Sequence, residues 1–148
     1  MSFSTTKMAA EKENRNEMQK KYVELQVLAN QLKQMQAHVQ ALDEHSIELG
    51  GIIKNIGELD TLGSGREILV PFSEGIFAKA NLQDSKELIV NVGSGILVRK
   101  GLSETAELLS KRINDINGQK EMLIKELQEI GIKAGKLEES LGSFEESS

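Results

Sequence analysis

The residues of this chain best able to bind a transition metal are two histidines, and their spacing argues against a shared site. His38 and His45 lie seven residues apart, which in a helix separates them by about 10.5 Å along the axis. One ion cannot hold both imidazole rings side by side across that distance, so we expect both histidines to be solvated. The chain has no cysteine, which excludes a disulfide framework, a thiolate nucleophile and a Cys-based zinc site. No metal site is predicted.

Other patterns that could support catalysis lack the context that catalysis needs. Gly93-Ser94-Gly95 follows an apolar run, but Val98 stands where a dinucleotide-binding fingerprint has its third glycine, and no Lys-Ser or Lys-Thr pair follows. Adjacent carboxylates such as Asp43 and Glu44 point apart on a helix, so they do not form an acid/base pair. No Ser/His/Asp arrangement has supporting context either. We therefore expect neither an enzyme nor a bound cofactor.

Charge and composition exclude several further classes of protein. The net charge is −5 and basic residues are sparse, whereas a sequence-independent nucleic-acid binder needs a concentrated basic surface. Only 3% of the residues are aromatic, too few for a base-stacking platform. Apolar runs are far shorter than a membrane span, and residues 1–13 lack the apolar core of a signal peptide. We expect no nucleic acid, no membrane and a cytoplasmic location.

Two long runs with heptad spacing predict the helices that position the remaining segments of the chain. In the first run, apolar residues recur at steps of three and four, and only Lys21 and Ser46 interrupt them. A repeat of about 3.5 residues keeps its stripe against a partner only when two helices wrap around each other. The stripe consists of Met18, Leu25, Leu28, Leu32, Met35, Val39, Leu42, Leu49, Ile53 and Ile56.

A matching run follows Ser103, which we expect to be the N-cap of a second helix with Glu104 and Glu107 in its first turn. Only Lys120 interrupts this run. Equal length and phase favour an antiparallel hairpin of helices, with an intermolecular coil as the alternative. Ser46 and Lys120 either set the register of the coil or mark points where it frays. The second stripe consists of Ala106, Leu109, Ile113, Ile116, Leu123, Leu127, Ile130, Ala134, Leu137, Leu141 and Phe144.

Between the helices the apolar period changes to two, which is typical of strands. We expect four short strands, at residues 67–72, 75–81, 87–92 and 95–100. Ser73-Glu74 and Gly93-Ser94 separate them at hairpin length, so the strands form two β-hairpins. Pro71 cannot donate to a strand ladder, so its strand lies at an edge or is bulged there.

These strands lack a polar face, and the chain offers nothing else to cover both of their apolar faces. An isolated two-stranded hairpin is marginally stable in water, and its edges invite pairing with other chains. We therefore expect residues 63–101 to be an oligomerisation platform between a helix at 1–62 and a second helix with an acidic tail at 102–148. The predicted assembly residues are Ile68, Leu69, Val70, Phe72, Ile76, Phe77, Leu88, Ile89, Val90, Val92, Ile96 and Val98.

Two motifs in the strand segment are distinctive. Glu67–Gly75 contains a Leu-Val-Pro strand and a tight turn, and continues to Phe77-Ala78-Lys79-Ala80. Leu88–Gly95 contains Val-x-Val-Gly-x-Gly and leads into a long helix. Together they resemble the central segment of the prefoldin α subunit, and the resemblance extends to the whole order of helix, two hairpins and helix. Two positions depart from the family pattern, Ile96 replacing a common aromatic residue and Arg99 a common acidic one, so a specialised α-class paralogue is the alternative.

The resemblance implies a mainly α fold with a small β segment: a long antiparallel coiled-coil hairpin whose two central β-hairpins join an oligomeric β-barrel. It implies an ATP-independent molecular chaperone in which two α-class subunits assemble with four β-class prefoldin subunits. The tips of the coiled coils would capture unfolded client proteins and deliver them to a group II chaperonin. A prefoldin-like scaffold subunit that bridges other proteins without holding clients is the alternative.

In such a hairpin both termini lie at the tip of the coil, where several apolar residues are candidates for client contact. Met suits the capture of varied apolar segments because its side chain is flexible and polarisable. We expect the client role for Phe3, Met8 and Phe144, whereas completion of the coil is the favoured role of the two leucines and of Met18. The candidates are Phe3, Met8, Met18, Tyr22, Leu137, Leu141 and Phe144.

Overall fold

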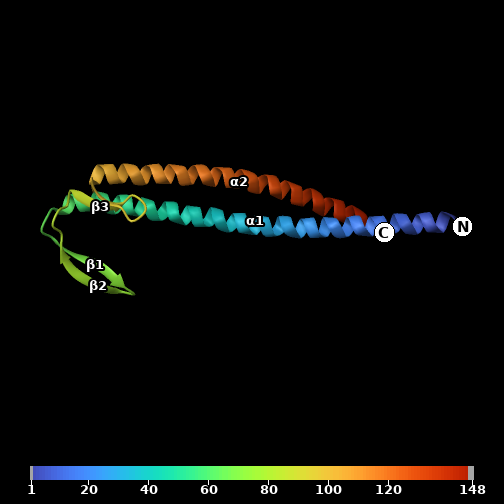
Figure 1. The fold of residues 1–148 in the computed structure, drawn as a ribbon, viewed down its shortest axis with the longest axis horizontal. Helices are drawn as coiled ribbons and strands as arrows, with labels where there is room; N and C mark the ends of the chain where they lie inside the picture. Colours follow the sequence, from blue (N-terminus) through green and yellow to red (C-terminus); the bar gives the residue numbers. More distant parts are fainter. Residues whose placement is uncertain (1, 147–148) are drawn as a thin grey trace. The chain divides into compact units, whose positions relative to one another are not determined.

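The computed structural model describes residues 2–146, with side chains described for residues 4–143. Helix α1 (Ser2–Leu62) and helix α2 (Leu102–Glu146) flank four strands. The strands are β1 (Glu67–Ser73), β2 (Ile76–Asn81), β3 (Glu87–Asn91) and β4 (Leu97–Gly101) (Figure 1). The predicted order of helix, two hairpins and helix is confirmed. The chain divides into two compact units, Met1–Leu42 with Gln119–Ser148 and Asp43–Gly118, which are described in turn.

In the first unit, α1 and α2 pack side by side in antiparallel directions. The Lys21 ammonium on α1 donates a hydrogen bond of 2.7 Å to the Ser140 hydroxyl on α2. Leu28, Ala134 and Leu141 are buried between the helices. This bond and this core confirm a coil within one chain rather than between chains. The less exposed positions follow the predicted heptads and include both lysines of the seam: Met18, Lys21, Leu25, Leu28, Leu32, Met35, Val39 and Leu42 on α1, and Lys120, Leu123, Leu127, Ile130, Ala134, Leu137 and Leu141 on α2.

Helix α1 extends beyond the end of α2. Because antiparallel helices advance equally in opposite directions, the Lys21–Ser140 bond places Glu146, the last residue of α2, near the level of Arg15. All residues from 4 to 17 are exposed. The seam positions in this stretch are polar (Ser4, Lys7, Glu11 and Asn14), so the coil ends at Met18 for a reason that is already present in the sequence.

In the second unit the seam continues, with Leu49, Ile56, Leu109 and Ile116 buried. Helix α2 begins at Leu102, directly after β4 ends at Gly101. The Thr105 hydroxyl donates a hydrogen bond of 2.9 Å to the Gly101 carbonyl. The prediction that Ser103 is the N-cap is therefore wrong, because the strand runs straight into the helix and places Ser103 inside its first turn.

The first hairpin, β1–β2, contains two backbone irregularities close together. The strand register shifts between Pro71 and Ser73, so the strand is bulged beside the proline, which is one of the two arrangements expected for it. The turn residues Glu74 and Gly75 have φ angles of 42° and 81°. Positive φ at both central residues defines a type I′ turn, in which glycine is favoured at the second position. The turn therefore lies one residue later than the predicted Ser73-Glu74.

The second hairpin, β3–β4, turns by the same geometry. Ser94 and Gly95 have φ angles of 50° and 76°, and the Ile96 N–H donates a 2.9 Å hydrogen bond to the Gly93 carbonyl. The predicted separator Gly93-Ser94 is again one residue early, because glycine must occupy the second central position of the turn. In the part of the chain that the structure describes, each sheet contains only its own two strands, so every strand keeps one free edge. Among the described residues, neither helix has a stretch long and apolar enough to cross a bilayer.

Candidate functional site

The first hairpin carries apolar side chains on both faces, and most of them are exposed. Leu69 and Phe77 lie on one face and are 60% and 56% exposed. Ile68 and Val70 lie on the other face, opposite Ala80 and Ala78. Because a sheet face of this kind is stable only when something covers it, the hairpin has the surface expected of an assembly element.

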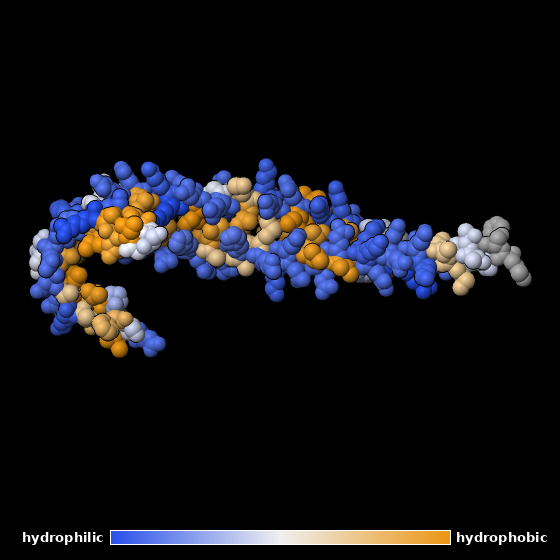
Figure 2. Space-filling model, viewed as in Figure 1, coloured by the Kyte–Doolittle hydropathy of each residue, from blue (hydrophilic) through white to orange (hydrophobic). Residues whose placement is uncertain are grey.

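The second hairpin, in contrast, places one face against the helices of its own unit. Leu88 and Val90 alternate with exposed residues and are half-buried. They line an apolar groove of about 520 Å³ together with Ile52, Ile56 and Leu59 of α1 and with Leu109 of α2. Apolar residues gather in Figure 2 where this hairpin meets the helices. We call this hollow the root groove.

The opposite face of the second hairpin is apolar and open. Ile89 is 70% exposed, and Leu97, which pairs with Asn91 on the same face, is 64% exposed. Leu97 is absent from the predicted assembly residues. Strand alternation is the signal that identifies it, because Leu97 is in phase with Arg99, the partner of Ile89.

The predicted assembly residues thus fall into two groups. Four of them are half-buried within the chain, namely Ile68, Leu88, Val90 and Val98. The other eight are exposed and available to a partner: Leu69, Val70, Phe72, Ile76, Phe77, Ile89, Val92 and Ile96. The exposed group offers the larger part of the apolar surface that another chain can cover.

Polar contacts hold the connection between the hairpins in place. The Lys86 ammonium lies 2.6 Å from an Asp60 carboxylate oxygen at the end of α1. The Lys86 backbone N–H donates a 2.8 Å hydrogen bond to Asp84, and Ser85 between them is buried. On the open face of the second hairpin, Arg99 lies 3.9 Å from Glu87. The cation that departs from the family pattern therefore has an acidic neighbour on its own sheet.

The candidate client residues at the ends of the coil differ in accessibility. Met8 is 70% exposed and Tyr22 is 45% exposed, whereas Leu141 is buried at 5%. Met18 and Leu137 are half-buried in the seam. This burial fits the interpretation that Met18, Leu137 and Leu141 complete the coil. The side chains of Phe3 and Phe144 lie outside the described residues.

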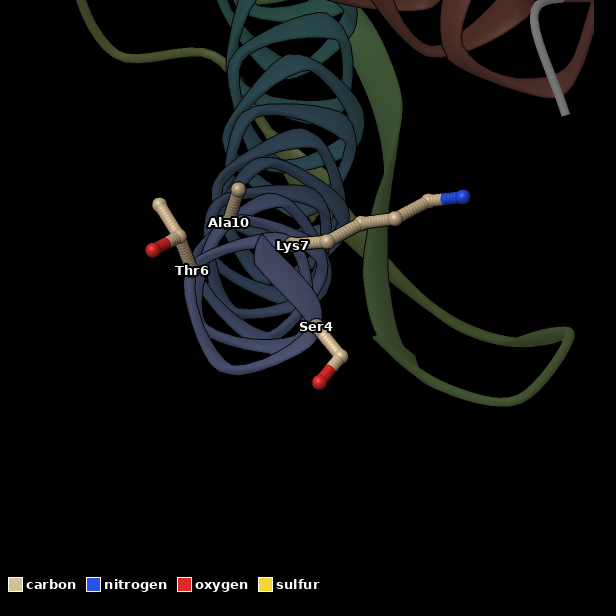
Figure 3. Close-up of a pocket in the computed structure, with 4 residues that line it drawn as sticks. All are labelled: Ser4, Thr6, Lys7 and Ala10. Atoms are coloured by element: carbon tan, nitrogen blue, oxygen red, sulfur yellow. The ribbon is translucent and has the colours of Figure 1, made fainter. Parts of the chain in front are cut away.

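At the start of α1, the described side chains form shallow hollows rather than an enclosed pocket. A shallow hollow there is lined by Ser4, Thr6, Lys7 and Ala10. Figure 3 shows these side chains spread around the helix and pointing away from it in different directions. Without converging polar groups this hollow lacks the usual features of a small-molecule site.

Sequence reasoning that considered only the seam missed a set of exposed apolar residues on the outer sides of the helices. In the first unit these are Val23, Val27, Met122, Ile124 and Ile132, and Met122 is 69% exposed. These residues can be identified in the sequence because their heptad positions lie outside the seam. Single exposed apolar residues are common on protein surfaces, so these residues suit matched control substitutions.

The two histidines and the carboxylates do not converge. His45 lies 3.9 Å from Glu48 one turn along α1, and both side chains are more than half exposed. No group of three or more potential metal ligands occurs in the part of the chain that the structure describes.

Comparison with known proteins gives a consistent result. The family model for prefoldin, described as prefoldin subunit, matches residues 28–142. The cryo-EM structure of filamentous PFD from Methanocaldococcus jannaschii superimposes with a TM-score of 0.71, covering 76% of this chain and 93% of that chain at 20% identity. At this identity the likeness shows the fold alone. No curated protein gives a significant match.

Proposed function

The chain belongs to the prefoldin subunit family, and from this premise we propose that it is an α-class subunit of an ATP-independent molecular chaperone. Subunits of this family are chaperones that assemble into oligomers. The class assignment rests on the two β-hairpins between the helices, because β-class subunits have a single hairpin. Its partners would be β-class subunits, two α with four β, in the cytoplasm.

The observation that carries the proposal is the uncovered apolar surface of the strands. Leu69, Phe72, Phe77 and Ile89 are all more than half exposed. Full burial of one such side chain contributes roughly 1.5–3 kcal/mol, so a partner that covers several of them gains enough to hold an assembly together. Equivalent strands from neighbouring subunits would complete a β-barrel, to which every free strand edge can contribute.

The helices would then act as the client-holding arms. In this proposal Met8 and Tyr22, with Phe3 and Phe144, contact apolar segments of unfolded proteins, which are passed on to a group II chaperonin. Met8 supports this role because it is exposed on a part of α1 that has no α2 residue beside it. A flexible thioether on such a surface can adapt to many sequences.

The assembly part is tested by co-expression with a β-class partner and measurement of the complex mass. Leu69→Asp should abolish the complex, because it places a charge in the proposed barrel interface. Met122→Asp, equally exposed but outside the strands, should leave the mass unchanged. If Leu69→Asp assembles like the wild type, the strands are not the assembly surface.

The client part is tested on the assembled complex with a chemically denatured protein whose aggregation is followed by light scattering. Removal of residues 1–10 and 143–148, or the paired change Met8→Ser and Tyr22→Ser, should weaken the suppression of aggregation without altering the complex mass. Val23→Ser with Met122→Ser provides a control of similar exposed apolar area. Unchanged suppression after both changes would refute client holding by the helix ends.

A scaffold subunit that holds no clients is the second candidate. It is favoured by the packing of the seam, which stays closed as far as Leu141, 5% exposed, with Lys21 bonded to Ser140 beside it. A complex of full mass with no effect on client aggregation would select this alternative.

A further inference from the structure

We propose that the turn of the first hairpin of one copy, residues Phe72–Ile76, docks in the root groove of a second copy of this chain. This inference rests on the proposed function, in which the strands form the assembly surface, and it names one contact and one partner for that surface. The two copies would be the pair of α-class subunits within one assembly. Residues 72–76 are called the turn segment.

The turn segment exposes two apolar side chains, one on either side of a glutamate. Phe72 is 79% exposed and Ile76 is 63% exposed, and they flank Glu74. The bulge between Pro71 and Ser73 changes the direction of the Phe72 side chain relative to a regular strand. Two large apolar groups at the tip of a hairpin are costly in water, so the segment has the composition of a docking element.

Glu74 occupies a backbone conformation that suits it poorly. Its φ of 42° lies in the left-handed region, where glycine, asparagine and aspartate are favoured in hairpin turns. Residues held in such conformations occur preferentially at functional positions, where another interaction offsets their cost. A cationic partner for the Glu74 carboxylate would supply that interaction.

The root groove offers the complementary surface. Its lining is mainly apolar and includes Ile52, Ile56 and Leu109, with the uncharged polar residues Asn55, Asn91 and Thr105 beside them. Arg112 is the only charged residue among the described residues that line it. None of residues 72–76 lines the groove of its own chain, so the groove is available to the turn segment of another copy. A guanidinium group at the edge of an apolar hollow is well suited to pair with a carboxylate.

The match between the two surfaces selects a second copy as the occupant. Phe72 and Ile76 would cover the apolar part of the lining while Glu74 reaches Arg112. An arrangement in which each copy inserts its turn into the other is self-complementary, as required for a closed pair of identical subunits. The contact also continues the strand surface that the proposed function already assigns to assembly.

Cysteine cross-linking provides the direct test, because the chain has no cysteine of its own. Copies carrying Glu74→Cys and copies carrying Arg112→Cys, the latter with a mass tag, are assembled together with the β-class partner and oxidised. A disulfide requires Cα atoms within about 7 Å, whereas the two long side chains of a Glu–Arg pair can hold their Cα atoms farther apart. A parallel sample is therefore treated with a short thiol-specific bis-maleimide, and in one of the two samples the variants should form a covalent pair of mixed mass. Lys111→Cys, one residue along α2 and exposed, replaces Arg112→Cys in the control and should cross-link at least about tenfold more slowly.

Charge reversal provides a second test that does not depend on oxidation. Glu74→Arg and Arg112→Glu should each weaken self-association of the chain about tenfold or more, and the double variant should recover most of the loss, because a close interfacial charge pair is restored in reversed order. Lys111→Glu should leave self-association unchanged.

The outcomes separate this contact from the general assembly surface. Equal cross-linking at positions 111 and 112, or no recovery in the double variant, overturns docking between copies. Cross-linking of Glu74→Cys to a cysteine introduced into the β-class partner, instead of to a second copy, also overturns it. In these cases loss of assembly by Leu69→Asp still supports the proposed function, whereas normal assembly of Leu69→Asp refutes that function independently.

Discussion

At the scale of single residues, glycine has opposite roles in the turns and in the helices. Gly75 has a φ of 81°, which an L side chain adopts only with strain, although a Cβ at this position would meet nothing within 4 Å. Gly51 lies inside α1 with equally open surroundings. The backbone conformation alone therefore determines whether alanine raises or lowers stability at each site.

The same substitution should accordingly shift stability in opposite directions. Gly51→Ala should raise the free energy of unfolding by about 0.5–1 kcal/mol, because alanine loses less backbone entropy in a helix. Gly75→Ala should weaken the first hairpin by roughly 1–2 kcal/mol. Urea unfolding followed by circular dichroism measures the first effect, and hydrogen exchange of the β1 and β2 amides measures the second. Shifts of equal sign would contradict this explanation.

Lys21 illustrates how a cation can occupy the seam of a coil. Its side chain is half-buried and bonds to Ser140, whereas the adjacent Lys20 is exposed. A polar residue in a seam lowers stability but helps to fix register.

Lys21→Leu should therefore raise the free energy of unfolding by about 1–2 kcal/mol through added apolar burial. Lys20→Leu, the matched change on the outer side, should alter it by less than about 0.5 kcal/mol. Thermal and urea unfolding of both variants give the comparison. A larger gain from Lys20→Leu would mean that Lys21 does not lie in the seam in solution.

At the scale of elements, the two helices contribute unequally to the coil. The first part of α1, residues 4–17, is exposed throughout and has polar seam positions. Most of this stretch extends past the end of α2, so it adds helical length without adding a core. The last turns of α2, in contrast, contain the buried Leu141 and the half-buried Leu137.

Deletions at the two ends should reflect this difference. Removal of residues 1–14 should reduce the helical signal at 222 nm while changing the free energy of unfolding by less than about 0.5 kcal/mol. Removal of residues 137–148 should lower it by about 3 kcal/mol or more, because two seam leucines are lost. Equal destabilisation by the two deletions would show that α1 packs against something along its whole length.

At the scale of the whole chain, apolar surface that one copy cannot cover is concentrated on the strands. Two-stranded sheets with exposed faces open easily, whereas a packed helical seam opens rarely. The free energy of local opening therefore differs along a single chain. Assembly should raise it most in the strands, where it is lowest in the isolated chain.

Hydrogen exchange with and without the β-class partner measures this distribution. Amides of β1 and β2 should exchange about tenfold more slowly or better in the complex, because the strands gain partners. Amides around Leu28 and Leu109, whose side chains are already buried, should change little. Protection that increases in the helices but not in the strands would place the assembly surface elsewhere.

The elements and their inward faces could be predicted from the sequence alone. The heptad steps from Met18 onward and the alternation in the strands predict which side of its helix or strand each side chain faces. That orientation depends only on local geometry. The seam of the first unit accordingly follows the predicted positions, even at Lys21 and Lys120. The order of helix, two hairpins and helix was equally accessible, and Pro71 indicated either an edge or a bulge in its strand.

The structure was needed to establish how the elements are placed along and against one another. It showed that α1 extends past α2, that α2 begins directly at Leu102, and that each turn lies one residue later than predicted. It also showed that the second hairpin covers the helices while the first stays open, and that Arg112 borders the root groove. Periodicity carries no information on axial position or on contacts between distant segments. These depend on the register of two helices and on the φ angles of turns, which are settled only when the chain packs.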